Sequence, residues 1–346
     1  MEFICYADWT QLPDSADRLF SQAAAESIFF SRTWFECLIR HRPASSENVV
    51  LACVVEDTHV LAILPLEQRE GGHYYALTNL YSSLYTLLLA KQAPRAVYAC
   101  LAKGLISLPF SLLHLGPIGE DDGQLQCLQQ TMESMGISCQ RRFGFYNWVQ
   151  PTQGQTFDDY LQSRSSRVRN TIARKSRKLE REYGYRVQLY QDHDEQALQD
   201  YHTVYQHSWK ANEQYGDFIA DLAWQLSQQG WLRLAILYTD ERPIAAQFWF
   251  VVHGKASIFK LVYDEDWKHY SPGTILTQHL LAHVIDTDKV QEIDFLTGND
   301  AYKQDWMSQR RERYGLYCIN KAKPVERRDR ISKWFEQLFN RSWRSH

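Results

Sequence analysis

Residues 259–276 read FKLVYDEDWKHYSPGTIL and place a strand pattern, a polar loop and a helix pattern in direct succession. The first turn of a helix has unpaired backbone N–H groups and a partial positive charge, so phosphate or thioester oxygens bind there. The predicted cofactor-binding residues are therefore those where the loop enters the helix: Ser271, Pro272, Gly273 and Thr274. The proline that follows Ser271 favours extended backbone at this serine, which suits a helix cap.

Length and composition indicate a globular protein of two domains. A chain of 346 residues is long for a single core, and 45% apolar residues with 14% aromatics are ample to bury two. The seven scattered cysteines contain no Cys-x-x-Cys pair, which argues against a disulfide scaffold or zinc finger and for a reducing compartment. The N-terminus lacks a signal-peptide pattern, and the longest apolar stretch, 104–115, is about half of a membrane span. We expect a cytoplasmic protein without a transmembrane segment.

The two halves of the chain resemble each other. Residues 51–66 and 234–250 both read as strand, acidic turn and strand, and both begin with Leu-Ala. Each hairpin follows a helix-like segment with a hydroxyl-Trp pair, Thr33-Trp34 in the first half and Ser208-Trp209 in the second. Hairpins after helices are common, so chance is the alternative explanation. We favour a duplicated α/β domain.

A polar stretch with Pro and Gly, 150–156, has no periodicity and suits a domain boundary. We therefore expect an N-terminal domain over 1–150 and a C-terminal domain over 151–322. Helices around a hairpin-rich sheet indicate an α/β fold of the α+β kind with a mixed sheet, rather than a doubly wound one. In the second half the periodicity predicts helices over 157–183, 192–212, 222–229 and 274–286, and strands over 232–237, 244–252, 256–263, 293–296 and 314–320.

Four motifs in the second half carry a family resemblance. They are Arg167–Glu180, Phe259-Lys260 with Tyr263-Asp264, Tyr270–Leu276, and Asp294–Gly298 with Tyr302-Lys303 and Trp306. Their order and spacing resemble the acyltransferases of the GNAT superfamily, in particular the CelD-like group named for a cellulose-biosynthesis protein, and their FemAB-type relatives. FemAB-like proteins consist of two tandem GNAT-type domains, so the repeated hairpin extends the resemblance to the whole chain. The implied fold is two tandem GNAT-like domains, each with the acyl-CoA N-acyltransferase fold.

The resemblance implies direct transfer of an acetyl or other acyl group from acyl-CoA or an acyl carrier to an amine or hydroxyl. A polysaccharide or cell-envelope precursor would be a fitting acceptor, and the N-terminal half would be structural or would shape the acceptor site. The loop departs from the family in one respect, because the usual second glycine or alanine is replaced by Ile275. Two alternatives therefore stay open: an aminoacyl-tRNA donor, as FemAB-like relatives use, or a non-catalytic GNAT-like binding or scaffold protein.

Acyl transfer to an amine needs a hydrogen-bond donor for the developing oxyanion and a route for the amine proton. Asp294 begins a buried-looking strand, where burial would raise its pKa, and it is the predicted general base. An Asp at a strand start also often only satisfies nearby backbone N–H groups. Lys260 lies in an otherwise apolar strand and must be paired or face a cleft. Asp264, four residues on, is its expected partner or helps it to orient substrate.

The predicted substrate-binding residues are Arg167, Arg174, Trp209, Lys303 and Trp306. The arginines belong to residues 163–186, which hold nine basic against two acidic residues, a local charge of +7. This segment binds phosphate or an anionic acceptor, or it is a solvated helix face. Aromatic residues do not alternate with its basic ones, which disfavours nucleic acid other than a tRNA donor. Trp306 packs under the acyl chain or closes the core.

No metal site is expected. His279 and His283 are four apart on one helix, but no Glu lies between them and no third ligand is near. The acceptor is expected to be a small molecule, a glycan or a peptide. Residues 323–346 are predicted to form a basic amphipathic helix that packs on the protein's own body or contacts a membrane surface peripherally. Its apolar stripe comprises Ile331, Trp334, Phe335, Leu338 and Phe339.

Overall fold

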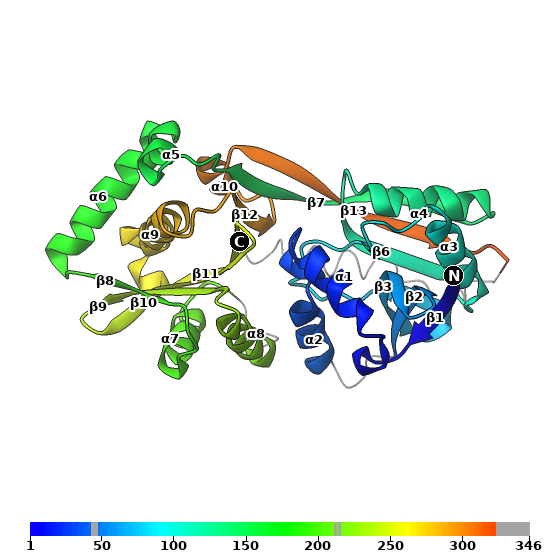
Figure 1. Ribbon diagram of the computed structural model, residues 1–346. Helices are drawn as coiled ribbons and strands as arrows, with labels where there is room; N and C mark the ends of the chain where they lie inside the picture. The colour runs from blue at the N-terminus through cyan, green and yellow to red at the C-terminus, as the bar shows by residue number, and fades with distance from the viewer. Residues whose placement is uncertain (43–47, 211–212, 214–215, 323–346) are drawn as a thin grey trace. The chain divides into compact units, whose positions relative to one another are not determined.

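The computed structural model describes residues 1–42, 48–210, 213 and 216–322 (Figure 1). It divides into two compact units. Unit 1 comprises Met1–Tyr146 together with the described residues from Arg311 onward, and unit 2 comprises Asn147–Arg310. None of the helices in the described ranges combines the length and the apolar character that crossing a bilayer requires.

Unit 1 is built on a mixed sheet with strand order β1-β2-β3-β4-β6-β13. Only β4 and β6 run parallel among these neighbours, paired from His73↔Leu112 to Tyr75↔His114, and α3 connects them. The elements are β1 (Glu2–Tyr6), α1 (Ser15–Ala24), α2 (Arg32–Arg40), β2 (Val49–Glu56), β3 (His59–Arg69), β4 (His73–Ala76), β5 (Leu88–Leu89), α3 (Ala96–Ser107), β6 (Leu112–Gly119), α4 (Gly123–Ser134), β7 (Ser138–Pro151) and β13 (Gln309–Ile319), with 3-10 turns η1 (Trp9–Gln11), η2 (Ile28–Phe30) and η3 (Glu70–Gly72).

Unit 2 repeats this plan with strand order β8-β9-β10-β11-β12, and residues 147–151 of β7 add a strand beside β12. Its parallel pair is β11 with β12, connected by α9. The elements are α5 (Phe157–Ser163), α6 (Ser166–Glu182), β8 (Arg186–Tyr190), α7 (Glu195–Gln206), α8 (Gly216–Gln228), β9 (Leu232–Thr239), β10 (Arg242–Val252), β11 (Lys255–Tyr263), η4 (Glu265–Tyr270), α9 (Pro272–Asp286), β12 (Glu292–Thr297) and α10 (Lys303–Trp306).

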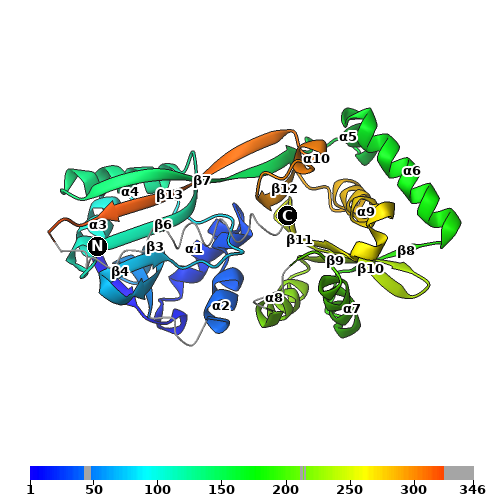
Figure 2. The ribbon, with the colours of Figure 1, turned by 180° about the vertical axis from the view of Figure 1, so that it is seen from behind.

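Helices cover both faces of the unit 2 sheet, which explains why its central strands are apolar at almost every position. Figures 1 and 2 show α6 and α9 on one face and α7 and α8 on the other. Every residue of β9 is buried. In β10, Trp249 packs into the core beneath α9, while its neighbours Phe248 and Phe250 contact Phe259 of β11.

The two units follow the same order of elements. Unit 1 runs β1, α1, α2, β2, β3, β4, α3 and β6, and unit 2 runs β8, α7, α8, β9, β10, β11, α9 and β12. The predicted hairpins are β2–β3 and β9–β10, both antiparallel. The prediction of a duplicated α/β fold with a mixed sheet is confirmed.

The last strand of each unit comes from the other half of the sequence. After β6 and α4 the chain enters β7, whose end pairs with β12 of unit 2. After β12 and α10 it enters β13, which pairs with β6 of unit 1 from Arg313↔Gly119 to Ile319↔Leu112. The strand expected over 314–320 therefore exists but belongs to unit 1. The domain limits at 150 and 322 stay a prediction, and the helix expected over 323–346 lies outside the described residues.

The helix expected over 157–183 is two helices, α5 and α6. Thr156 caps α5 in a capping box with Asp159, and Ser165 caps α6 by accepting a hydrogen bond from the Val168 amide. A serine hydroxyl can accept a hydrogen bond from the backbone in place of a helix carbonyl, and at Ser165 it caps a new helix instead of continuing the first one.

Candidate functional site

The parallel strands β11 and β12 separate part-way along their length. Within these fully described strands, pairing runs from Lys255↔Glu292 to Ser257↔Asp294 and stops there. Both strands are irregular where they part, because the β10–β11 register shifts at Phe259 and the β12–β7 register shifts after Asp294. Such bulges redirect strands and expose their edges. The opening between the two strands is the candidate site.

Lys303 of α10 holds the end of β12 in its bent form. Its buried ammonium donates to Phe295 O at 3.0 Å and to Thr297 O at 2.5 Å, on either side of Leu296, which has the unusual φ of 52°. Burial lowers the Lys303 pKa, and the nearby Asp300 carboxylate opposes this shift. Lys303, predicted to bind substrate, thus contacts the backbone at the opening.

Gly298 makes room for the Lys303 ammonium. Its φ is 116°, in the region that favours glycine, and a Cβ there would lie 3.2 Å from Lys303 Nζ and 3.0 Å from Asp300 Oδ2. A side chain at this position would displace the charged pair, so the Thr-Gly-Asn-Asp run shapes the site through its backbone.

Asp294 lies at the last parallel pair, and its Oδ1 accepts two hydrogen bonds. Asn147 Nδ2 donates at 2.5 Å and the Leu296 amide at 2.6 Å. Beside them Trp148 Nε1 donates to Asn299 Oδ1 at 2.9 Å. These contacts match the alternative in which the aspartate satisfies nearby N–H groups, and its catalytic role stays a prediction. Asn147 and Trp148 of β7 were not predicted, because nothing local marks them as neighbours of β12.

Lys260 forms a buried ion pair with Glu213. The two charged atoms lie 2.7 Å apart, and each side chain is 8% exposed. The expected pairing of Lys260 with Asp264 is wrong, because Asp264 binds Arg242 at 2.7 Å and accepts from the Asp266 amide as the cap of η4. Capping fixes the Asp264 carboxylate beyond the end of β11, away from the lysine.

Lys210 was missed by the sequence analysis. Burial and the positive charges of Lys260 and Lys303 lower its pKa to about 7, against the opposing effect of Glu213 and Asp300. Through these couplings the lysines and acids of β11, of the β12–α10 region and of the segment after α7 share one electrostatic environment. An amine with this pKa is about half neutral at pH 7 and accepts a proton readily. The one sequence signal was its place beside Trp209.

Trp209 links Lys210 to β11. Its ring lies 4.4 Å from the Tyr263 ring, centroid to centroid, and the Lys210 ammonium is 5.7 Å from the Trp209 centroid. Trp209, predicted to bind substrate, therefore packs beside the half of β11 that has left β12.

The start of α9 differs from the prediction. Ser271 is left-handed, with φ 54° and ψ 52°, and its side chain makes no cap bond. It must turn the chain directly from η4 into α9, and the following proline disfavours the right-handed alternative. Its amide donates to Lys268 O and that of Thr274 donates to Ser271 O, both at 3.0 Å, while Pro272 has no N–H. Among these four described residues, Gly273 alone has a backbone N–H that donates to no other backbone group outside the helix.

Gly273 is packed closely against β11. A Cβ on it would lie 3.2 Å from the Tyr263 ring and 3.5 Å from Leu261, and its carbonyl accepts from Gln247 Nε2 at 2.9 Å. A larger side chain here would push α9 away from the separating strand.

The three other predicted substrate-binding residues lie elsewhere in unit 2. Arg167 is 74% exposed and binds Asp305 at 2.6 Å, and Arg174 is exposed on the same helix. Trp306 is buried in the core, where its carbonyl accepts from Tyr160 Oη at 2.7 Å. Trp306 therefore takes the core position that was the alternative for it.

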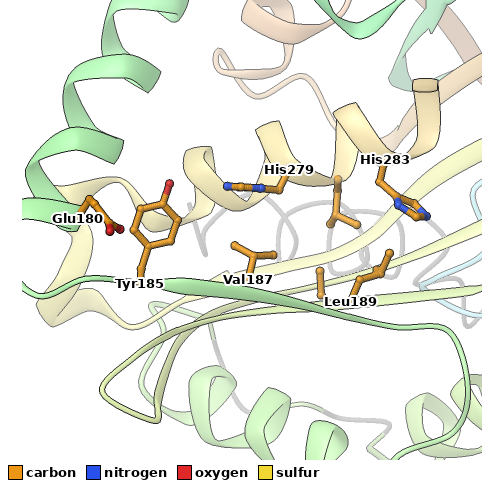
Figure 3. A pocket seen from close by; sticks show the side chains of 8 residues that line it. Glu180, Tyr185, Val187, Leu189, His279 and His283 are labelled. Atoms are coloured by element: carbon orange, nitrogen blue, oxygen red, sulfur yellow. The ribbon is translucent and has the colours of Figure 1, made fainter. Parts of the chain in front are cut away.

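A groove of about 420 Å³ lies between α6, β8 and α9. Figure 3 shows Tyr185, just before β8, and His279 of α9 projecting into it, with Glu180 at one end and His283 at the other. Burial lowers the His279 pKa. None of the predicted site residues lines this groove. Across the described ranges, no three His, Cys, Asp or Glu side chains gather where they could hold a metal ion.

Comparison with known proteins identifies the central part of unit 2. Residues 166–304 match the family model described as an acetyltransferase (GNAT) domain. No curated protein matches the chain. The structure of FemX is similar, with a TM-score of 0.63 at 10% identity, covering 93% of this chain and 98% of that one.

Two further structures are also similar. One is the C-terminal domain of a putative lysylphosphatidylglycerol synthetase from Agrobacterium fabrum, with a TM-score of 0.58 at 10% identity, covering 94% of this chain and 97% of that one. The other is L-PGS from Bacillus licheniformis, with a TM-score of 0.55 at 11% identity, covering 83% and 87%.

Identities this low show a shared fold, and the coverage extends the likeness over both units. The segment matched by the family model contains the parted strands, α9, Lys260, Asp294 and Lys303. Residues 166–304 of this chain therefore match a GNAT acetyltransferase domain, and the chain as a whole shares its fold with FemX.

Proposed function

We propose that the chain is an acyltransferase that moves an acyl group directly from an activated donor to an amine or hydroxyl at the opening between β11 and β12. The observation that carries the proposal is the separation of these strands after Ser257 and Asp294, beside the charged cluster of Lys210, Lys260 and Lys303. The match to a GNAT domain supports the same reaction class.

Parted strands suit this chemistry because, beyond Ser257 and Asp294, pairing between β11 and β12 no longer takes up the backbone N–H groups of their facing edges. Such groups stabilise the oxyanion that develops on the donor carbonyl. The acceptor nitrogen or oxygen attacks the carbonyl carbon, and its proton passes to neutral Lys210. The bond to the leaving group then breaks, and the Lys210 ammonium returns the proton to that group, which balances the reaction without a covalent enzyme intermediate.

Lys303 and Asp294 act as positioning residues in this scheme. Lys303 keeps β12 bent through two carbonyls, and Asp294 ties the same bend to Asn147 of β7. Burial lowers the Lys210 pKa most, the Lys260 ammonium lowers it further, and the Glu213 carboxylate opposes both effects.

An acyl-CoA is the first candidate donor, with the Gly273 amide as its contact at α9. An aminoacyl ester of tRNA is the second candidate. Two observations favour it: the single amide of Gly273 is a weak pyrophosphate site, and one of the similar folds is titled a putative lysylphosphatidylglycerol synthetase. Membership of the CelD-like group, a polysaccharide or envelope precursor as acceptor, a cytoplasmic location and a peripheral membrane contact through residues 323–346 belong to the same proposal.

Thermal stability with acetyl-CoA, a longer acyl-CoA and free coenzyme A tests the donor, since a ligand that binds the folded state raises the melting temperature. We expect an upward shift with acyl-CoA that Gly273→Val removes, while the exposed change Lys103→Met on α3 of unit 1 keeps it. If millimolar acyl-CoA did not shift the melting temperature, aminoacyl-tRNA would become the preferred donor. Lack of transfer from both donor classes to any acceptor would contradict an acyltransferase and leave a binding protein.

A further inference from the structure

Two cysteines of unit 1 lie next to each other on neighbouring strands. The sulfur atoms of Cys139, near the start of β7, and Cys318, near the end of β13, are 3.2 Å apart as thiols. The strands β7 and β13 are hydrogen-bonded neighbours in the sheet. Cys318 is fully buried, whereas Cys139 is partly accessible.

We infer that Cys139 and Cys318 form a redox modification site, at which a small disulfide such as glutathione disulfide converts the two thiols into an intrachain disulfide. The sulfur atoms need to approach from 3.2 Å to about 2.05 Å, a movement that side-chain rotation on adjacent strands supplies. No assignment of the acyl-transfer site is involved, so this inference stands apart from the proposed function.

The reaction balances in two exchange steps. The Cys139 thiolate, the more accessible of the two, attacks glutathione disulfide, forms a mixed disulfide and releases one glutathione. The Cys318 sulfur then attacks the Cys139 sulfur and releases the second glutathione. Two protein thiols are oxidised, one glutathione disulfide is reduced to two thiols, and both protons pass to glutathione. The hydrogen bond with the Cys139 sulfur and then burial raise the pKa of Cys318, so the second step should accelerate with rising pH.

The position of the pair in the chain makes this disulfide consequential. Unit 1 is assembled from two pieces of sequence, and all of unit 2, Asn147–Arg310, lies between Cys139 and Cys318. The disulfide would join the two pieces covalently and close unit 2 into a loop. Closing so long a loop restricts the unfolded chain, so oxidation should raise the melting temperature.

The cysteine distribution provides a sharp test. Cys318 is the one cysteine after Asp240, and the other six precede it. A specific protease site inserted between Asp240 and Glu241, in the exposed β9–β10 turn, cuts the full chain into a piece with six cysteines and a piece with one. After treatment with glutathione disulfide and cutting, a non-reducing denaturing gel shows whether the pieces remain joined.

We expect one band of full-chain mass from the oxidised protein and two bands after reduction. Cys139→Ser and Cys318→Ser should each give two bands without reduction, whereas the control Cys127→Ser, an exposed cysteine on α4, should give one. Peptide mass spectrometry then identifies the joined residues, and on oxidation the wild type should fall from seven titratable thiols to five, whereas each of the two variants should keep its six.

Other results would overturn the inference. Two bands from fully oxidised wild type would show that Cys318 does not react. One band from Cys139→Ser would assign Cys318 another partner, and a band of twice the mass would show linkage between chains. A Cys5–Cys53 disulfide on the neighbouring strands β1 and β2 cannot join the pieces, because both cysteines precede the cut.

Discussion

Unit 1 and unit 2 share one order of elements but differ at the same point of their sheets. The third pair of the parallel strands is Ser257↔Asp294 in unit 2 and Tyr75↔His114 in unit 1. A carboxylate with two hydrogen bonds therefore occupies the position that an imidazole occupies in the other unit.

Aromatic rings fill the unit 1 position. The His114 ring lies 4.5 Å from the Tyr317 ring and 5.9 Å from the Tyr75 ring, and a Cβ on Gly315 would lie 2.7 Å from His114 Nε2. Burial, and the charge of Arg69, lower the His114 pKa to about 4, so this ring is neutral at physiological pH. The repeat preserved the fold, and unit 2 alone has a cluster of lysines and acids at this point of the described sheets.

The largest effect is expected from the buried ion pair of unit 2. Lys260→Met removes the ammonium that lies 2.7 Å from the buried Glu213 carboxylate, which should lower the free energy of unfolding by about 3–5 kcal/mol. Adding Glu213→Gln should recover most of this loss. As the unit 1 control, Asp17→Asn removes an exposed partner of Arg32 and should change stability by less than about 1 kcal/mol. If urea denaturation gave the same loss of unfolding free energy for Lys260→Met and Asp17→Asn, the ion pair of unit 2 would be no more important than the exposed pair of unit 1.

Lys303→Met is expected to affect transfer next most strongly. It leaves the Phe295 and Thr297 carbonyls without their ammonium donor and releases the bend of β12. We expect transfer to fall about 100-fold, equivalent to about 2.7 kcal/mol, measured as kcat/KM. Lys103→Met, an exposed change on α3 of unit 1, is the control and should stay near wild type. Full activity in Lys303→Met would show that transfer does not depend on the bend of β12.

A direct comparison of the two parallel pairs comes third. Asp294→Asn retains an oxygen that can accept from Asn147 and Leu296 but removes the charge, so transfer should fall about tenfold, or 1.4 kcal/mol. His114→Phe retains the ring packing of unit 1 and should leave kcat/KM within about twofold. The comparison fails if the unit 1 variant loses as much activity as the unit 2 variant.

The smallest effect concerns pH. If neutral Lys210 accepts the acceptor's proton, the rate should rise as pH increases through about 7, and Lys210→Met should flatten this limb. Its folded-state pKa lies below the ordinary 10.5, so the unfolded chain binds more protons between these values. The contribution of Lys210 to the free energy of unfolding therefore increases with pH across that window. The melting temperatures of wild type and Lys210→Met, plotted against pH, should converge as pH rises. If the two plots of melting temperature against pH ran parallel, the pKa of Lys210 would not be lowered in the folded protein.

Most elements could be predicted because their signals are local. The apolar runs of β9 and β10 around their acidic turn and the helix pattern of α9 are each contained within one short segment. The exchange of β7 and β13 could not be predicted, because an alternating strand pattern indicates which face is buried and not which strand it pairs with. The unit limits after Tyr146 and before Arg311 lie within the strands β7 and β13, so a prediction based on polar linkers does not find them.

The site was predictable in part. Lys260, Asp294 and Lys303 stand out as charges within or beside apolar strands, and the structure brings all three to the opening of one sheet. Glu213 and Asn147 gave no such signal, because a partner contributed by a loop or a distant strand has no fixed spacing from the residue that it contacts. Ser271 was misjudged because its backbone is set by the junction of two helices, which a residue-by-residue rule does not include.

The exchange of β7 and β13 also bears on the order in which a ribosome could complete this molecule. Unit 2 takes its outer strand from residues already synthesised, so its sheet can close once β12 has emerged. Unit 1 must hold an open edge at β6 until β13 arrives, nearly two hundred residues later. During that interval β6 is exposed to pairing with other chains, and the half of the protein that is made first is the half that finishes folding last.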